Sequence, residues 1–397
     1  MSKDISVVDL FCGCGGLYEG FKQAGFKASV SSDIWEPAFK TFVRNNNSTP
    51  FVLGDITNLE IKKKIIQEGK GSKVLIGGPP CQAYSMAGQR NVDDPRGKLF
   101  EDYLEIVNNI KPEFFVMENV KGLLSMEHDK QKLNPAEKKE LNKIKSLEND
   151  KIDLMLKRKQ SKNTNKIKFS IKEEEKLEEI KKKLKLLKIN TSNLRVKVTQ
   201  TIKKRFLDLG YFVEIKVLNS ANYGVPQKRE RVIIIGSHNG LNINFPEPVY
   251  LERKNTFNEE IFRKNHPNWI TVKEAIDDLK NKSEDVSFNH IFTKCGDDFK
   301  KKIKNTPIGK SVYGGFSDAY FRCPPNEPSR TVKENHGGVF IHYEKDRFMT
   351  PRELARLQSF DDHFIFEGSK SQILVQIGNA VPPKLGYSIA EVLKENI

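Results

Sequence analysis

The sequence predicts an α/β fold built on an open sheet, and three observations support this prediction. Short apolar runs of strand length alternate with segments of helical periodicity. A glycine-rich break follows the first apolar run, and acidic or thiol side chains stand after later ones. Ligands of open α/β sheets bind at the carboxyl ends of the strands, so these side chains also indicate a binding site. The predicted strands are residues 6–11, 28–33, 51–56, 74–76, 114–117, 211–217 and 232–236.

The length and composition predict a soluble protein with two domains. With 397 residues, the chain is long enough to bury a sizeable core. No run approaches the roughly 18 consecutive apolar residues of a membrane span, and the first residues lack the apolar stretch of a secretory signal. We therefore expect a cytoplasmic protein. The five cysteines form neither a disulfide framework nor a paired Cys-x-x-Cys zinc pattern, so reduced thiols are expected.

The net charge is strongly positive. The formal charge is +15, with 67 Lys and Arg residues against 52 Asp and Glu residues. Such an excess favours a polyanionic partner, and binding of this kind weakens as the salt concentration rises. Abundant Lys, Asn and Ile are also typical of chains encoded by AT-rich genomes, so charge alone leaves the nature of the partner open.

The first predicted strand and the residues after it indicate a nucleotide-type binding unit. The strand over 6–11 is followed by the stretch CGCGG at 12–16 and then by a helical pattern. Glycines let the backbone approach a ligand closely, although the full G-x-G-x-x-G pattern and a Walker lysine are missing. Asp33 ends the next strand, where such folds place the acid that binds ribose hydroxyls. Asp55 follows the third apolar run, where it suits either an adenine edge or a helix cap.

The fourth strand ends abruptly in a reactive side chain. The stretch GGPP at 77–80 stops the strand, because proline cannot donate to a sheet and glycine permits a sharp exit. Cys81 comes next, so its thiol is expected at the carboxyl end of the strand. That position favours a nucleophile over the alternative, a small buried hydrophobic residue.

Charged side chains are expected beside this thiol. Glu118 ends the fifth strand, at the same predicted edge of the sheet. The stretch QKRER at 227–231 leads into the last strand, and strand alternation would put Gln227, Arg229 and Arg231 on one side. Two guanidinium groups on one face suit a phosphate, a carbonyl oxygen, or an ion pair with an acid such as Glu118.

Residues 127–190 differ in composition from the rest of the chain, with 20 Lys and Arg residues, 12 Asp and Glu residues, no glycine and one proline. Asn134 and Ser170 each precede a Glu by three residues, which is typical of a helix start. Narrow apolar stripes follow at Leu141, Ile144 and Leu147 and at Leu177, Ile180, Leu184 and Leu187. We expect an inserted helical hairpin, whose lysines either face solvent or contact phosphates.

The regular pattern loosens after the last predicted strand. From about 237 to 336 the chain is rich in Pro, Asn, Gly and aromatic residues, which predicts a small, loop-rich second domain. Its basic and aromatic side chains are suited to reading a nucleic-acid groove. Thr350 and Glu353 then predict a capped helix, and a last helix follows 378–383.

Six motifs in this order resemble those of the cytosine-C5 DNA methyltransferases. They are DLFCGCGG at 9–16, GGPPCQ at 77–82, ENV at 118–120, QKRER at 227–231, TPRELARLQSF at 350–360 and GNAVPP at 378–383. Their order and spacing agree with the family along nearly the whole chain. The insert at 127–190 and much of 237–330 fall outside the resemblance, and the second of these corresponds to the family's variable target-recognition domain.

The resemblance implies a fold and a cofactor site. A Rossmann-like S-adenosylmethionine-dependent catalytic domain would span 1–236, a target-recognition domain 237–336, and a segment returning to the catalytic domain 337–397. Asp33 would bind the ribose and Asp55 would lie near the adenine, which either Ile34 or Trp35 would cover. The expected cofactor-binding residues are Phe11, Gly13, Gly15, Gly16, Asp33, Ile34, Asp55, Ile56, Pro79, Asn379 and Val381.

The family's chemistry implies catalytic roles for four residues: Cys81 as nucleophile, Glu118 as its carboxylate partner, and Arg229 and Arg231 as flanking cations. Cytosine C5 is a poor nucleophile, so the thiolate adds to C6 and makes an enamine whose C5 attacks the sulfonium methyl group. Glu118 would hydrogen-bond N3 and Arg231 would hold the base carbonyl, and no metal is required. The residues expected at the DNA substrate are Gln82, Ser85, Gln227 and Thr331.

The expected partner is double-stranded DNA, from which the target cytosine must be flipped because its ring atoms are inaccessible inside a duplex. We expect a monomeric bacterial enzyme of restriction-modification type, with no membrane partner; a cognate restriction endonuclease would act on the same site without a stable complex. Two other functions stay open, namely tRNA cytosine methylation and DNA binding without catalysis. The long 237–336 region favours DNA, and the retained Cys81, Glu118 and Arg231 favour catalysis.

Overall fold

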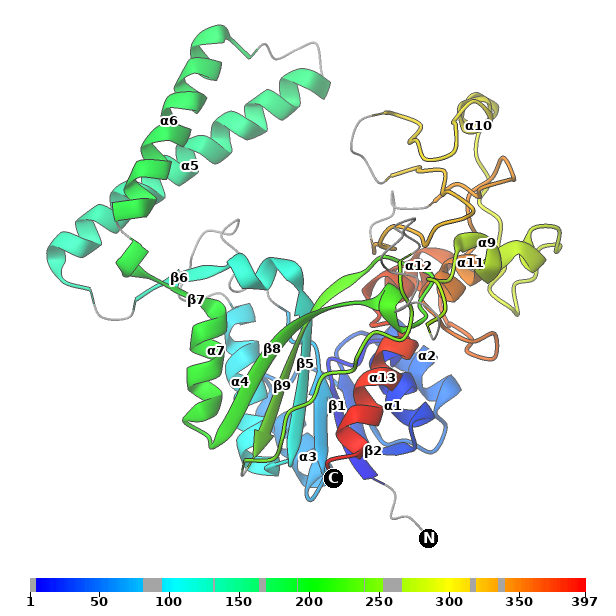
Figure 1. Ribbon diagram of the computed structural model, residues 1–397, viewed down its shortest axis with the longest axis horizontal. Helices are drawn as coiled ribbons and strands as arrows, with labels where there is room; N and C mark the ends of the chain where they lie inside the picture. Colours follow the sequence, from blue (N-terminus) through cyan, green and yellow to red (C-terminus); the bar gives the residue numbers. More distant parts are fainter. Residues whose placement is uncertain are drawn as a thin grey trace. The chain divides into compact units, whose positions relative to one another are not determined.

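Figure 1 shows the computed structural model of the chain, which describes residues 5–80, 95–130, 133–163, 169–190, 192–238, 240–252, 266–314, 319–334 and 340–397. The chain divides into two compact units, residues 1–123 with 203–397 and residues 124–202. The region 237–336 belongs to the first unit, so its separation as a recognition domain stays a prediction.

A seven-stranded sheet in the order β3-β2-β1-β4-β5-β9-β8 forms the centre of the first unit. The pairs among β1 to β5 are parallel, whereas β9 is antiparallel to both of its neighbours. The α/β fold class is therefore confirmed, with the third strand ending before Asp55. The strands are β1 Ile5–Leu10, β2 Phe26–Asp33, β3 Phe51–Leu53, β4 Val74–Gly77, β5 Phe114–Val120, β8 Tyr211–Asn219 and β9 Glu230–His238.

Helices cover both faces of this sheet (Figure 1). On one face, strand residues such as Val116 and Ile233 share a buried core with Phe21 and Ile389. On the other face, the rings of Phe115 and Phe206 stack with centroids 3.9 Å apart. Because both faces are buried at the centre of the sheet, the central strand β4 is a continuous apolar run, whereas the edge strand β8 alternates between exposed residues and buried or half-buried ones. The covering helices are α1 Gly16–Gln23, α2 Glu36–Asn45, α3 Leu59–Gly69, α4 Pro95–Ile110, α7 Val198–Leu207 and α13 Pro383–Lys394.

The last helix packs very closely on the first. A Cβ added at Gly20 of α1 would lie 2.2 Å from the carbonyl oxygen of Pro383, and one at Gly386 would lie 2.8 Å from that of Leu17. Only glycine permits backbones to approach so closely. This contact brings the C-terminal segment beside the glycine loop, so the two motifs farthest apart in the chain become neighbours.

The remaining helices of the first unit lie in its C-terminal half. The helix α11 begins with the predicted capping box: Thr350 Oγ1 accepts from the Glu353 N–H at 3.2 Å, and the Glu353 carboxylate accepts from the Thr350 N–H at 2.8 Å. These helices are α9 Val272–Ile276, α10 Asp297–Lys304, α11 Pro351–Leu357 and α12 Lys370–Asn379, with 3₁₀ turns at Lys121–Ser125, Ser220–Tyr223 and Asp277–Leu279.

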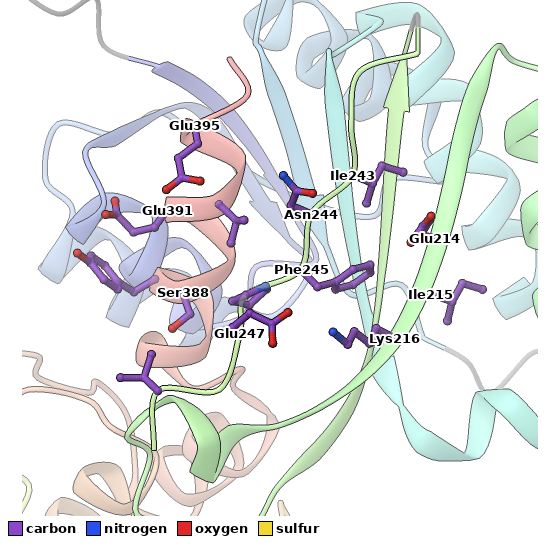
Figure 2. A pocket seen from close by; sticks show the side chains of 14 residues that line it. Glu214, Ile215, Lys216, Ile243, Asn244, Phe245, Glu247, Ser388, Glu391 and Glu395 are labelled. Carbon is purple, nitrogen blue, oxygen red and sulfur yellow. The ribbon is translucent and has the colours of Figure 1, made fainter. Parts of the chain in front are cut away.

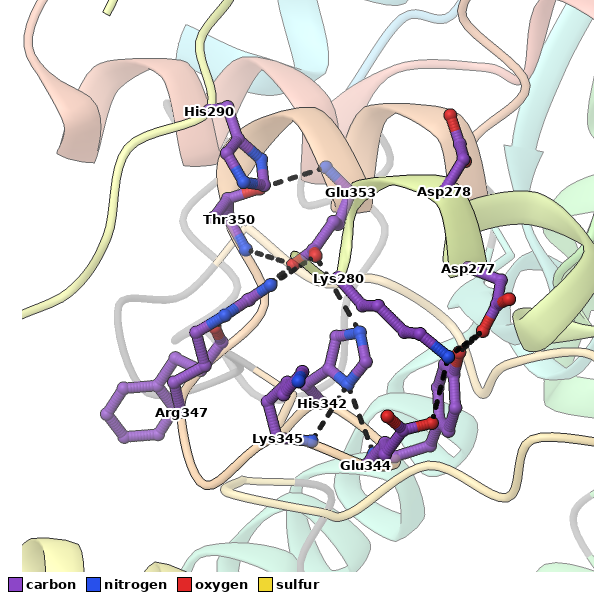
Figure 3. Close-up of polar contacts among 12 residues, drawn as sticks. Asp277, Asp278, Lys280, His290, His342, Glu344, Lys345, Arg347, Thr350 and Glu353 are labelled. Carbon is purple, nitrogen blue, oxygen red and sulfur yellow. Dashed lines mark hydrogen bonds and ion pairs between the residues drawn. The ribbon is translucent and has the colours of Figure 1, made fainter. Parts of the chain in front are cut away.

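Figure 3 shows the buried polar cluster around this cap. Arg347 donates to both carboxylate oxygens of Glu353, at 2.7 and 2.8 Å. His342 is fully buried, and its Nε2 lies 3.8 Å from the same carboxylate. The second buried histidine, His290, has its Nδ1 2.9 Å from Thr350 Oγ1. The cap therefore holds α11 to segments 60 residues away in the chain.

The second unit is the predicted helical hairpin. Both expected capping boxes are present, with Asn134 accepting from the Glu137 N–H at 2.9 Å and Ser170 from the Glu173 N–H at 3.3 Å. The predicted apolar stripes form its core, which includes Ile144. Its elements are β6 Glu127–Asp129, α5 Pro135–Asn163, α6 Ile171–Asn190, the 3₁₀ turn Ser192–Leu194 and β7 Arg195–Lys197. Across both units, none of the described helices combines the length and apolar character that a membrane span requires.

Candidate active site

Two adjoining cavities lie at the carboxyl ends of β1, β2 and β4, where the sequence predicts a site, and Phe11, Asp33 and Pro80 line both of them. The first cavity has a volume of about 510 Å³ and is also lined by Gly13, Pro79, Glu118, Asn379 and Val381. The second has a volume of about 440 Å³ and is also lined by Ile34, Asp55 and Ile56. Ten of the eleven residues named here were predicted as cofactor or catalytic residues, the exception being Pro80. The structure thus brings the glycine loop, the strand ends and the C-terminal motif together.

Nine of the eleven residues expected to bind the cofactor line these cavities, and Glu118 is the tenth predicted site residue found there. The other two, Gly15 and Gly16, shape the loop. Gly15 has a φ of 92°, in the left-handed region that favours glycine, and a Cβ there would lie 2.8 Å from the Phe42 ring. A Cβ at Gly16 would lie 2.5 Å from the carbonyl oxygen of Val381, so the absent side chain admits the C-terminal motif.

Asp33 ties the glycine loop to the end of β2. Its carboxylate accepts from the Gly13 N–H at 2.8 Å and from the Trp35 N–H at 2.9 Å. Burial raises the pKa of Asp33, and the N–H donors of Trp35, Gly13 and Ile34 act against this rise. Because Asp33 lines both cavities, the same carboxylate that holds the loop also faces the space where a ligand would lie.

The second cavity distinguishes the alternatives left open for Ile34 and Asp55. Ile34, which is 66% exposed, lines this cavity together with Asp55, whereas Trp35 lines the first cavity. The cap of α3 is Asn58, whose side chain accepts from the N–H groups of the first turn. Asp55 instead accepts from the Thr57 N–H at 2.9 Å in a local turn. The helix-cap alternative for Asp55 is therefore wrong.

Glu118 and Arg231 form an ion pair at the end of β5. Glu118 is paired with Ile233 of β9 and Val120 with Arg231, so Glu118 and Arg231 are diagonal neighbours. Arg231 Nε lies 2.8 Å from Glu118 Oε1, and both side chains are mostly buried. Burial lowers the pKa of Arg231, and the adjacent Glu118 carboxylate opposes this effect. The ion pair that the sequence left as an alternative is thus present, and it presents Glu118 to the first cavity.

The thiol expected between these groups falls in a part of the chain that is not described. Cys81, Gln82 and Ser85 lie outside the described residues, so their predicted roles stay predictions. The chain leading to them is described: Asn119 donates from Nδ2 to the Pro79 carbonyl oxygen at 3.0 Å. Asn119 therefore anchors the backbone two residues before Cys81. The sequence offered only its place in the ENV motif as a signal.

Besides Gly15 and Gly16, four predicted residues do not line either cavity in the described structure: Gln227, Arg229, Arg231 and Thr331. Gln227 and Arg229 are buried, and the guanidinium of Arg229 donates to main-chain carbonyl oxygens. Thr331 donates to the Lys228 carbonyl oxygen at 3.0 Å. The strand β9 begins only at Glu230, so strand alternation by itself does not place Gln227 and Arg229. The charges of Arg231 and Glu118 both affect the pKa of Arg229, and the catalytic role assigned to Arg229 stays a prediction.

A buried acid in the first cavity was missed by the sequence reasoning. Asp9 is 1% exposed and lines the cavity, and neither carboxylate oxygen has a hydrogen-bond partner among the described residues. Burial and the nearby Asp33 carboxylate raise the pKa of Asp9 well above its usual value. An acid inside an otherwise apolar strand was the available signal. An unpaired carboxylate in such a place is suited to a positively charged ligand group.

A further cavity of about 780 Å³ lies elsewhere, between β8, residues 243–249 and α13 (Figure 2). Four glutamates, Glu214, Glu247, Glu391 and Glu395, line this cavity. None of the residues predicted to be functional lies among its described lining, so its size does not make it the candidate active site.

Comparison with known proteins places these features in a family. The family model described as C-5 cytosine-specific DNA methylase matches residues 5–147 and 185–395. The match includes 237–330, so the expectation that this region lies outside the resemblance was wrong. Within the insert, the unmatched part is the distal segment of the hairpin, residues 148–184.

Individual relatives also match along nearly the whole chain. A Type II methyltransferase from Haemophilus parahaemolyticus, M1.HphI, is 33% identical over 404 residues, which cover 99% of this chain and 87% of that protein. M.NgoFVII from Neisseria gonorrhoeae is 31% identical over 415 residues, covering 100% and 89%. The solved structure of the Dnmt2 methyltransferase from S. pombe has a TM-score of 0.56 to this chain, at 15% identity and 98% coverage of both chains.

 A second solved structure, of a DNA modification methyltransferase encoded within an E. coli prophage, has a TM-score of 0.62 to this chain, at 21% identity and 99% coverage of both chains.

The two solved structures support the fold, and the family model and the curated relatives support the enzyme class expected from the sequence. The chain carries the family's motifs on the strand ends and loops that line the two cavities. We conclude that the chain belongs to the C-5 cytosine-specific DNA methylase family and is a DNA (cytosine-5-)-methyltransferase.

Proposed function

We propose that this protein transfers the methyl group of S-adenosylmethionine to C5 of a flipped-out cytosine in a specific double-stranded DNA sequence, through a covalent bond between Cys81 and C6. The observation that carries this proposal is that Glu118, whose carboxylate pairs with Arg231, lines the same cavity as the glycine loop. The chain that ends at Pro80, just before Cys81, lines the same cavity.

The described residues fit S-adenosylmethionine. The cofactor carries positive charge on its sulfonium and ammonium groups. The carboxyl group of Asp9 lines the first cavity without a hydrogen-bond partner among the described residues, and a bound cation would favour its ionised form against the burial that raises its pKa. Asp33 stands between the two cavities, where it is suited to ribose hydroxyls, and Ile34, Asp55 and Ile56 line the second cavity as an adenine site would require. When bound, the cofactor supplies an electrophilic methyl group.

The protein's own groups would then act on the cytosine. Arg231 holds Glu118 through Oε1, and a Cβ at Gly78 would lie 3.3 Å from Oε2, so this second oxygen faces the exit of β4. From there Glu118 would hydrogen-bond N3 of the base, where negative charge develops. Asn119 fixes the Pro79 carbonyl and thereby the start of the segment that carries Cys81.

The Cys81 thiolate would add to C6, and the electron pair of the C5–C6 double bond would form the new bond from C5 to the methyl carbon. The methyl–sulfur bond would break at the same time, and its electron pair would stay on sulfur, so that the cofactor leaves as a thioether. Loss of the C5 proton to solvent returns an electron pair to the ring, and the thiolate leaves as the double bond re-forms. Cysteine suits both steps because its thiolate is a good nucleophile and a good leaving group.

The central experiment is the substitution Cys81→Ser. We expect it to abolish tritium transfer from labelled S-adenosylmethionine to duplex DNA while cofactor affinity stays close to that of the wild type. Turnover at the wild-type rate would refute the nucleophile. Duplex DNA containing 5-fluorocytosine should trap a covalent adduct at Cys81, because fluorine at C5 cannot leave as a proton.

The substrate and partners need separate tests. Side-by-side assays with duplex DNA and tRNA distinguish the proposed substrate from the RNA alternative. Bisulfite sequencing of DNA from an expressing host would report the recognised sequence, to which Gln82, Ser85 and Thr331 would contribute contacts. We propose a monomer in the bacterial cytoplasm, and a cognate restriction endonuclease that acts on the same sequence without a stable complex.

A further inference from the structure

Four segments far apart in the chain meet in a buried hydrogen-bond network outside the two cavities. The segments are residues 227–229, 331–334, 357–358 and 377–381. Three side chains join them, those of Gln227, Arg229 and Gln358, and each is at most 2% exposed. The second segment leaves the predicted recognition region, and the fourth lines the first cavity.

Gln227 uses all of its polar atoms in this network. Its Nε2 donates to Gln358 Oε1 at 2.7 Å and to the Leu357 carbonyl oxygen at 3.1 Å, and its Oε1 accepts from the Val332 N–H at 2.9 Å. Gln358 continues the chain of contacts by donating to the carbonyl oxygens of Ile377 at 2.6 Å and Ala380 at 3.3 Å. The two amides thus connect Val332 to the cavity-lining segment.

Arg229 makes the same connection directly. Its Nη1 donates to the Val332 carbonyl oxygen at 3.0 Å, while its Nη2 donates to those of Gly378 at 3.0 Å and Ala380 at 3.1 Å. A guanidinium is a rigid planar fork, so bonds from its two ends fix the relative positions of the groups that accept them. Burial lowers the pKa of Arg229, which shows that the site is costly for a charge unless these carbonyls are held in place.

The backbones of the two joined segments also touch. A Cβ at Gly378 would lie 2.4 Å from Glu334 N and 2.5 Å from Lys333 C. Glu334, Asn379 and Val381 all line the first cavity. A displacement of residues 331–334 would therefore move residues that line that cavity.

We infer that Gln227, Arg229 and Gln358 are positioning residues that couple the recognition region to the cofactor cavity, so that binding of DNA and binding of cofactor change each other's affinity. This inference rests on the proposed function. The coupling is reciprocal, because the same hydrogen bonds hold Thr331, expected at the DNA, and Asn379, expected at the cofactor, in one arrangement. A displacement of either segment breaks these hydrogen bonds and leaves the buried side-chain donors and acceptors without partners, which is costly.

The test measures binding, so it does not depend on turnover. S-adenosylhomocysteine is titrated into the full-length protein by calorimetry, without DNA and with a saturating duplex that carries the sequence mapped by bisulfite sequencing. We expect the duplex to lower the dissociation constant of S-adenosylhomocysteine for the wild type by about fivefold or more. In Arg229→Lys this factor should fall to within about twofold of unity, because one ammonium group cannot bridge Val332 and Gly378.

Gln358→Met provides a second variant that removes hydrogen bonds while preserving side-chain length and should lose the coupling in the same way. Arg352→Lys is the matched control: Arg352 is equally buried and donates to the carbonyl oxygens of Phe288, Asp361 and Phe364, none of them in the cavity-lining segment. It should lower the melting temperature but retain the wild-type factor.

A merely structural role would lower the stability of all three variants and leave the factor unchanged, which would overturn the inference. A wild-type factor near unity would also overturn it. If the wild type bound no S-adenosylhomocysteine, the proposed function would fail as well; if it bound both ligands independently, the inference alone would fail.

Discussion

Acid should destabilise this protein through His342, a buried histidine that cannot easily accept a second proton. Its Nδ1 accepts from the N–H groups of Glu344 and Lys345, both at 3.1 Å, so the ring proton resides on Nε2 (Figure 3). The side chain is fully buried. Burial lowers the pKa of His342 to about 4, and the nearby Glu353 carboxylate opposes this shift only in part.

The magnitude follows from the difference between the folded and unfolded pKa values. An unfolded histidine titrates near 6.5, so the folded value of about 4 corresponds to about 3 kcal/mol at roughly 1.4 kcal/mol per pKa unit. As the pH falls below about 6.5, the unfolded chain binds this proton first. The contribution to stability is therefore complete above pH 6.5 and is lost progressively down to about pH 4.

Urea unfolding between pH 7 and pH 4 measures this loss. In His342→Asn, the side-chain oxygen can replace Nδ1 as the acceptor and does not titrate, so the variant should lack this part of the pH dependence. The free energy of unfolding of the wild type minus that of His342→Asn should fall by about 3 kcal/mol from pH 7 to pH 4. Carboxylates also lose stability in acid, but they are common to both proteins and cancel in the difference.

The control is His363→Asn, the same replacement at a histidine whose side chain is 68% exposed. If His342→Asn and the wild type lose stability in parallel, the reasoning is refuted. The same holds if nuclear magnetic resonance shows the His342 ring titrating near pH 6.5 in the folded protein.

Three further predictions concern the site. Asp9→Asn should weaken the binding of S-adenosylmethionine about tenfold by removing the unpartnered carboxyl group. Calorimetry with S-adenosylhomocysteine, which lacks the sulfonium charge but keeps the ammonium group, tells which cation is concerned; an unchanged affinity of the variant for S-adenosylmethionine would contradict the pairing. Glu118→Gln should lower the rate of tritium transfer by about a hundredfold, whereas Lys73→Ala, at the opposite end of β4, should not change it. Gly378→Ala should cost about 1–3 kcal/mol of stability in thermal unfolding, because its Cβ would overlap the backbone of residues 333–334; an unchanged melting temperature would count against that close approach.

Patterns within a few residues of one another were sufficient to predict most of the elements. The capping residues Asn134, Ser170 and Thr350 begin their helices as expected, because a cap and its partner are only three residues apart. The strand ends that carry Asp33 and Glu118 were also predicted, since apolar runs and their glycine or acidic ends are local features.

The roles of Arg229 and Asp9 depended on contacts that no local pattern describes. Arg229 is 149 residues from Gly378, and its buried guanidinium donates to the carbonyl oxygen of that glycine. Asp9 lies in a cavity lined by the glycine loop, β4 and the C-terminal motif, and its carboxylate has no hydrogen-bond partner among the described residues.

The sequence by itself determined the fold class, the helical insert, the family and ten of the residues that line the two cavities, because these follow from periodicity, capping and motifs read along the chain. Only the tertiary structure decided which charged side chains face the cavities and which are buried in the network of Gln227, Arg229 and Gln358. The physical reason is that burial and hydrogen bonding are set by neighbours in space, and for Gln227 and Arg229 those neighbours lie more than 100 residues away in sequence.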